Sequence, residues 1–86
     1  MNKLNKKFTE LEYNLNQAYE MTQDMECVEF FMKSPSYVLS QPDGKVRSAG
    51  AMIYVCAQAL QDEVFSIRET EYGIEVVRTD NVEPIF

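Results

Sequence analysis

The residues best suited to chemistry in this 86-residue chain are carboxylates gathered toward its N-terminal end. Positions 10 to 29 hold six acids and no lysine or arginine: Glu10, Glu12, Glu20, Asp24, Glu26 and Glu29. Paired carboxylates can act as general acid and base, or can hold a divalent cation. The spacing of Glu10, Glu20 and Asp24 instead spreads them along the solvated face of a helix, without a convergent loop. We therefore expect a binding surface and no catalytic site.

The remaining residues offer few routes to catalysis or to a bound cofactor. The chain has no histidine, so it lacks the commonest general base and metal ligand. Its three glycines, Gly44, Gly50 and Gly73, are too scattered to form a phosphate-binding loop. Cys27 and Cys56 stand alone in the sequence, and we expect two buried free thiols, with a disulfide as the alternative. The sequence predicts no enzyme, no cofactor and no metal site.

The charge balance of the chain favours a basic protein partner. The net charge is −6, and the first seven residues hold three of the eight bases, which leaves 14 acids against five bases, or −9, over residues 8–86. An acidic chain is poorly suited to direct binding of nucleic acid, because that affinity comes from neutralising phosphates with cations. No apolar run is long enough to span a membrane, and no hydrophobic segment follows the N-terminal lysines. We expect one cytoplasmic domain covering residues 1–86.

The acids lie on an element that also has a core-facing side. Small or apolar side chains recur in alternating steps of four and three: Leu4, Phe8, Leu11, Leu15, Ala18, Thr22 and Met25. This spacing predicts a helix with one narrow apolar seam, which ends near Asp24 or Met25. The opposite side of that helix carries the residues that we expect to meet solvent: Glu10, Tyr13, Gln17, Glu20 and Asp24.

Beyond this helix the pattern predicts a mixture of strands and one further helix. Alternation of Val28, Phe30 and Met32 indicates a strand over 27–33, with a continued helix as the alternative. Residues 37–39 and 45–47 flank a Gln-Pro-Asp-Gly sequence that is typical of a type I turn, and they predict a hairpin. Ser48 is a suitable cap for an apolar helix over 49–63.

A second hairpin is expected after that helix. Phe65 and Ile67 alternate with polar residues, as do Ile74 and Val76, and Gly73 provides the turn between the two strands. The chain is therefore predicted to be a small α+β domain of order α-β-β-β-α-β-β, in which two helices pack on an antiparallel sheet.

The acidic helix face is the predicted functional surface. Carboxylates spaced along a rigid helix can imitate a row of phosphates, and their field speeds the encounter with a basic partner. In size and charge the chain is similar to phage-encoded host-takeover proteins, including DNA-mimic anti-restriction and anti-CRISPR proteins. That similarity implies a non-enzymatic inhibitor of a host protein, working in the host cytoplasm. The predicted partner-binding residues are Glu10, Glu12, Tyr13, Gln17, Glu20 and Asp24.

Two other functions remain open from the sequence. One is a homo-oligomeric adaptor or subunit, possible as a homodimer, that acts through apolar contacts of its helices. The other is a small-ligand-binding sponge, with aromatic side chains lining a pocket and basic side chains pairing with an anion. The residues considered for that pocket are Tyr37, Tyr54, Tyr72, Arg47, Arg68 and Arg78.

Overall fold

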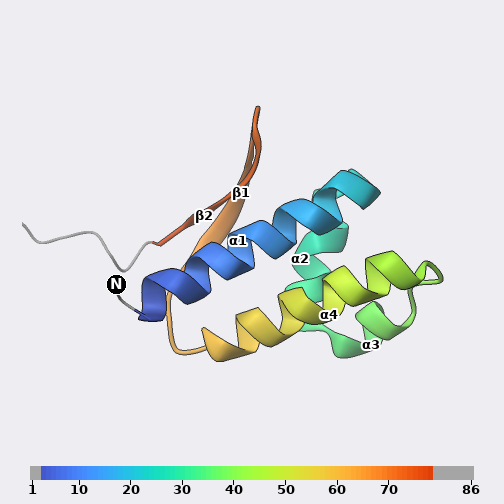
Figure 1. Cartoon of the computed structure of the whole chain (residues 1–86), viewed down its shortest axis with the longest axis horizontal. Helices are drawn as coiled ribbons and strands as arrows, with labels where there is room; N and C mark the ends of the chain where they lie inside the picture. Colours follow the sequence, from blue (N-terminus) through green and yellow to red (C-terminus); the bar gives the residue numbers. More distant parts are fainter. Residues whose placement is uncertain (1–2, 79–86) are drawn as a thin grey trace, which may run out of the picture.

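A computed structural model describes residues 3–78 of the chain as helices followed by a β-hairpin (Figure 1). The elements in chain order are α1 (Lys3–Thr22), α2 (Met25–Lys33), α3 (Pro35–Leu39), α4 (Gly44–Ala59), β1 (Ser66–Thr70) and β2 (Gly73–Val77). One flank of α1 packs along α4 and another carries β2, while α2 packs on α4. The α+β class is thus confirmed at the level of helices plus a two-stranded antiparallel sheet. The predicted order of elements is wrong between residues 27 and 47.

Helix α1 forms where the apolar seam predicts it. Its buried side chains are Phe8, Leu11, Leu15 and Ala18, which follow the predicted steps of three and four. The helix ends at Thr22, and the next residue, Gln23, takes a left-handed backbone with φ of 52°. That conformation breaks the helix and turns the chain toward α2.

The predicted strand over 27–33 is wrong, because this segment is helix α2. The Asp24 carboxylate accepts hydrogen bonds from the backbone N–H groups of Glu26 and Cys27, at 3.0 and 3.2 Å, and so caps a new helix. Burial then follows helical spacing: Cys27, Val28 and Phe31 are inside, whereas Phe30 is half exposed. Val28, Phe30 and Met32 do not share the one buried face that their alternation indicates, because Phe30 is half exposed.

The predicted hairpin around residues 41–44 is also wrong. Ser34 ends α2 and caps the short helix α3, whose first residue is proline. The turn sequence connects α3 to α4, and Asp43 caps α4 by accepting a 2.8 Å hydrogen bond from the Lys45 N–H. Helix α4 therefore begins five residues before the expected Ala49 and ends at Ala59 instead of residue 63. The residue that caps α4 is Asp43, and not Ser48 as predicted.

The C-terminal hairpin is confirmed. β1 and β2 pair antiparallel, with Ile67 opposite Val76 and Glu69 opposite Ile74. Gly73 has a φ of 130°, which other residues rarely adopt, and so it permits the turn.

The core lies where α1, α2 and α4 meet and extends under the hairpin. Its fully buried large side chains are Leu11, Leu15, Val28, Phe31, Ile53 and Leu60. Ile74 continues this core from β2, and Phe65 packs edge-on against Phe8 with ring centroids 5.3 Å apart. Within residues 3–78, no helix combines the length and the apolar character needed to cross a bilayer.

Gly50 sets how closely α4 approaches α2. A Cβ at this position would lie 3.1 Å from the Phe31 ring, tighter than ordinary packing. Overpacking a core usually costs about 1–3 kcal/mol, and the Phe31 ring is fully buried, whereas alanine gains up to about 1 kcal/mol over glycine inside a helix. Gly50→Ala should therefore lower the free energy of unfolding by roughly 0.5–2 kcal/mol. Urea denaturation measures this change.

Gly44→Ala is the matched control, because a Cβ there would meet only the Arg47 side chain at 3.6 Å. It sits in the same helix and should change the free energy of unfolding by less than about 1 kcal/mol. Equal losses for the two variants would contradict close packing of Gly50 on Phe31.

Candidate functional site

The predicted acidic face lies on the solvent side of α1, but its six residues do not share one role. Glu10, Gln17 and Glu20 are exposed, and Tyr13 exposes 63% of its surface. These four residues form a ridge on α1, between the flank that meets α4 and the flank that meets β2. They are free to contact a partner.

Glu12 and Asp24 are instead engaged in holding the fold. One carboxylate oxygen of Glu12 accepts a 3.0 Å hydrogen bond from the backbone N–H of Val76 in β2. Asp24 caps α2 through two backbone N–H groups. Helical periodicity could not distinguish them from the other acids, because the Glu12 contact spans 64 positions and the Asp24 cap serves a helix predicted as a strand.

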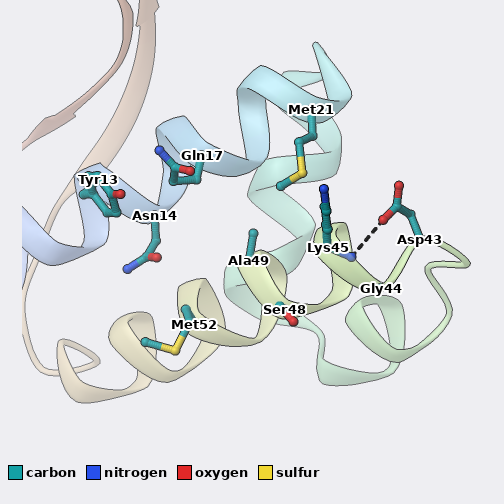
Figure 2. A pocket seen from close by; sticks show the side chains of 10 residues that line it. All are labelled: Tyr13, Asn14, Gln17, Met21, Asp43, Gly44, Lys45, Ser48, Ala49 and Met52. Atoms are coloured by element: carbon teal, nitrogen blue, oxygen red, sulfur yellow. Dashed lines mark hydrogen bonds between the residues drawn. The ribbon is translucent and has the colours of Figure 1, made fainter.

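A groove runs between α1 and α4 beside this ridge (Figure 2). Its volume is about 930 Å³, and it opens broadly to solvent. The residues that line it are Tyr13, Asn14, Gln17, Met21, Asp43, Gly44, Lys45, Ser48, Ala49 and Met52. Tyr13 and Gln17 thus belong both to the predicted face and to the groove, whereas the predicted carboxylates do not line it.

Two methionines on opposite walls make the groove apolar. Met21 of α1 is 43% exposed and Met52 of α4 is 51% exposed, so both leave large apolar surfaces in solvent. Sequence reasoning missed both. Met21 lies beside the acidic face in the helical pattern, and Met52 was expected to be buried because α4 is apolar around most of its circumference. The pairing of the two helices decided their exposure.

The charges around the groove are unevenly placed. Lys45 lies at the end of the groove near Met21, and the Asp43 carboxylate beside it is engaged with the first turn of α4 (Figure 2). Toward the other end lies Glu10, close enough to Cys56 for its charge to act on that thiol. The charged residues that line the groove, Asp43 and Lys45, are therefore both at one end, and the rest of its lining is neutral.

Neither cysteine is arranged as a nucleophile. Cys27 and Cys56 are free and buried, as expected. Burial raises the pKa of the Cys56 thiol, and the nearby Glu10 charge raises it further, despite a 3.9 Å contact from the Asn14 amide. A raised pKa keeps the thiol protonated at neutral pH, where it is a poor nucleophile. Within residues 3–78, no cluster of three or more acids or cysteines is placed to hold a metal ion.

The residues considered for a ligand pocket are not brought together. Tyr37 packs against Phe30 and Phe31 near α3, with ring centroids 5.3 and 5.4 Å apart, while Tyr72 is 91% exposed at the hairpin turn. Figure 1 places α3 and that turn in separate parts of the molecule.

The three arginines have partners of their own. Arg47 donates to the backbone carbonyls of Gln41 and Pro42. Arg68 forms an ion pair with Glu75 at 2.8 Å. Arg78 lies 4.5 Å from the Phe8 ring centroid and donates to the Asn5 side chain. These contacts account for Arg47 and Arg68 without an anionic ligand, whereas the buried Nε of Arg78 has no hydrogen-bond partner among the described residues.

No family model, curated protein or solved structure matches this chain. Its function is therefore inferred from its own residues and their geometry.

The cap made by Asp24 can be separated from a partner-binding role. Asp24→Ala removes the acceptor of two backbone hydrogen bonds and should lower the free energy of unfolding by about 1 kcal/mol, as loss of a helix N-cap does. Thermal or urea denaturation monitored by circular dichroism measures this loss.

Glu20→Ala, at an exposed position on α1, is the control and should stay within about 0.5 kcal/mol of the parent. If both variants had the same free energy of unfolding as the parent, the hydrogen bonds of the Asp24 cap would not stabilise the fold. Asp24 would then be an exposed acid available to a partner, like Glu10 and Glu20.

Proposed function

We propose that this chain is a non-enzymatic interaction protein that binds a basic, amphipathic helical segment of a partner protein in the α1–α4 groove. The observation that carries the proposal is the exposure of Tyr13, Met21 and Met52 along one groove between two packed helices. Exposed apolar surface that is continuous and bordered by polar groups is characteristic of protein-binding sites.

The shape and side chains of the groove suit a helix. An amphipathic helix can place its apolar stripe between two neighbouring helices, with anchors every three or four residues. Methionines are unbranched and polarisable, and so they adapt to differently shaped apolar anchors. Tyr13 adds a large apolar ring with a hydroxyl group that can stay hydrated at the edge of an interface.

The charge of the chain favours a basic partner. The protein carries a net charge of −6, and the exposed ridge next to the groove includes Glu10 and Glu20. Opposite charge would accelerate encounter and help to select the partner, while the apolar groove would supply most of the lasting affinity. Lys45 marks one end of the groove, and it would favour an acidic or C-terminal group of the bound segment there.

A second candidate function, which would use the exposed carboxylates of α1 in place of the groove, is an inhibitor that covers the nucleic-acid-binding surface of a host protein by mimicking DNA. The small size of the chain, its net negative charge and the exposed carboxylates of α1 support it. In that case duplex DNA would compete with this chain for the partner, and the affinity would fall steeply with salt.

A pair of designed peptides tests the groove. A helical peptide of about 14 residues with leucines on one face and lysines on the other should bind, and its glutamate counterpart with the same leucines should bind at least tenfold more weakly. Isothermal titration calorimetry measures affinity, and amide chemical shifts locate the contact at residues such as Gln17, Met21 and Ser48.

Two substitutions on the same helix provide the matched control. Met52→Glu places a charge in the groove and removes a large apolar contact. It should therefore lower the affinity for the lysine peptide by at least roughly tenfold. Val55→Glu makes a similar change at a position that is 59% exposed but does not line the groove, and it should leave binding unchanged. Equal weakening by both variants would exclude the groove, and equal binding of the two peptides would exclude a basic partner.

A further inference from the structure

The two edges of the β-hairpin differ in whether their outward backbone groups are hydrogen-bonded. The backbone N–H groups of Ile74 and Val76 in β2 point away from β1, because they donate to Asn16 at 2.8 Å and to Glu12 at 3.0 Å. The Asn16 amide also donates to the Ile74 carbonyl at 2.9 Å. Side chains of α1 thus take the place of a neighbouring strand along β2.

The edge of β1 has no such cover within the described part of the chain. Along an antiparallel ladder, residues alternate between those that bond across to the partner strand and those that point away from it. Since Ile74 and Val76 point away from β1, their opposite residues, Glu69 and Ile67, point away from β2. No described residue hydrogen-bonds to the backbone N–H or C=O groups of Ile67 and Glu69.

We propose that β1 is a dimerisation edge, on which the β1 strand of a second copy of this chain pairs antiparallel. The two hairpins would then form one four-stranded sheet, ordered β2–β1–β1–β2, across a two-fold axis. The same edge contributes from both copies, which is the usual form of a symmetric dimer. This interface is separate from the α1–α4 groove and does not depend on what that groove binds.

The charges of β1 select one register for this pairing. Outward-pointing residues must pair with outward-pointing residues, so three registers place most of the two strands side by side. One of them sets Arg68 opposite Arg68 of the second copy, and another sets Glu69 opposite Glu69. The third sets Ile67 opposite Ile67, with Arg68 opposite Ser66. Like charges directly opposite destabilise a sheet, so the register centred on Ile67 is favoured.

The dimer would also complete the sheet physically. A two-stranded hairpin is marginally stable alone, and here α1 supports it on the β2 side only, so pairing at β1 would add a neighbour on the other side. On the inner face of this hairpin Ile67 and Val76 are half-buried and pack on the core, so pairing at Ile67 would extend an apolar surface that already exists. On the outer face Arg68 is already paired with Glu75, which limits repulsion between the two copies.

Sedimentation equilibrium of the full chain tests the proposal. The parent protein should dimerise reversibly at micromolar concentration. Glu69→Pro removes the outward N–H of residue 69 in each copy while leaving the β1–β2 ladder bonds in place, and it should raise the dimer dissociation constant by at least roughly tenfold.

Glu69→Ala is the matched control, because it also loses the contact with the Tyr19 hydroxyl but keeps the backbone N–H. It should dimerise like the parent. A parent that stays strictly monomeric at about 1 mM would overturn the proposal, because its dimer dissociation constant would then lie well above that concentration. A dimer that is equally stable in the proline and alanine variants would overturn it too.

Disulfide trapping identifies the register independently of the proline variant. Ile67→Cys should form a covalent dimer under mild oxidation, since directly opposite residues have Cα atoms within disulfide range. Arg68→Cys and Glu69→Cys would each be trapped efficiently only in a register that we exclude. Because Cys27 and Cys56 are buried, the parent is the background control. Preferential trapping through residue 68 or 69, or no trapping above background, would contradict this register.

Discussion

The hydrogen bonds between α1 and the edge of β2 are the constraint on which the rest of the structure depends. Asn16 and Glu12 satisfy three backbone groups of β2 that a third strand would otherwise have to satisfy. The apolar seam of α1 lies next to them and packs into the core, so one helix holds both the hairpin and α4. A small chain with a two-stranded sheet can fold in this way because a helix does the work of a strand.

This use of α1 determines which surfaces are available for function. On the flank that faces β2, side chains of the helix form hydrogen bonds with the backbone of β2, and its apolar seam is buried in the core. The remaining ridge, with Tyr13, Gln17 and Glu20, meets solvent beside the α4 groove. An apolar groove is therefore left beside exposed acids. At the opposite edge of the hairpin, the outward backbone groups of Ile67 and Glu69 have no partner among residues 3–78.

Sequence patterns predicted α1 and the β1–β2 hairpin well and the segment between residues 27 and 47 poorly. The seam of α1 repeats over five turns, and the last hairpin combines alternation with a turn glycine, so local preference and tertiary packing agree there. Between Cys27 and Arg47 the apolar runs are short enough to fit a strand or a helix. The capping residues Asp24, Ser34 and Asp43 favour helices here. Each accepts hydrogen bonds from backbone N–H groups of a first helical turn, which have no partner within the helix itself.

The sequence by itself determined the amphipathic helix, the final hairpin, the acidic balance and the solvent-facing position of Tyr13 and Gln17. These follow from periodicity and composition, which are local properties of the chain. Only the tertiary structure decided that Glu12 is tied to β2, that Met21 and Met52 are exposed on the two walls of one groove, and that no residue among 3–78 covers the outer edge of β1. Those features depend on which distant elements become neighbours, and no local pattern of residues encodes that choice.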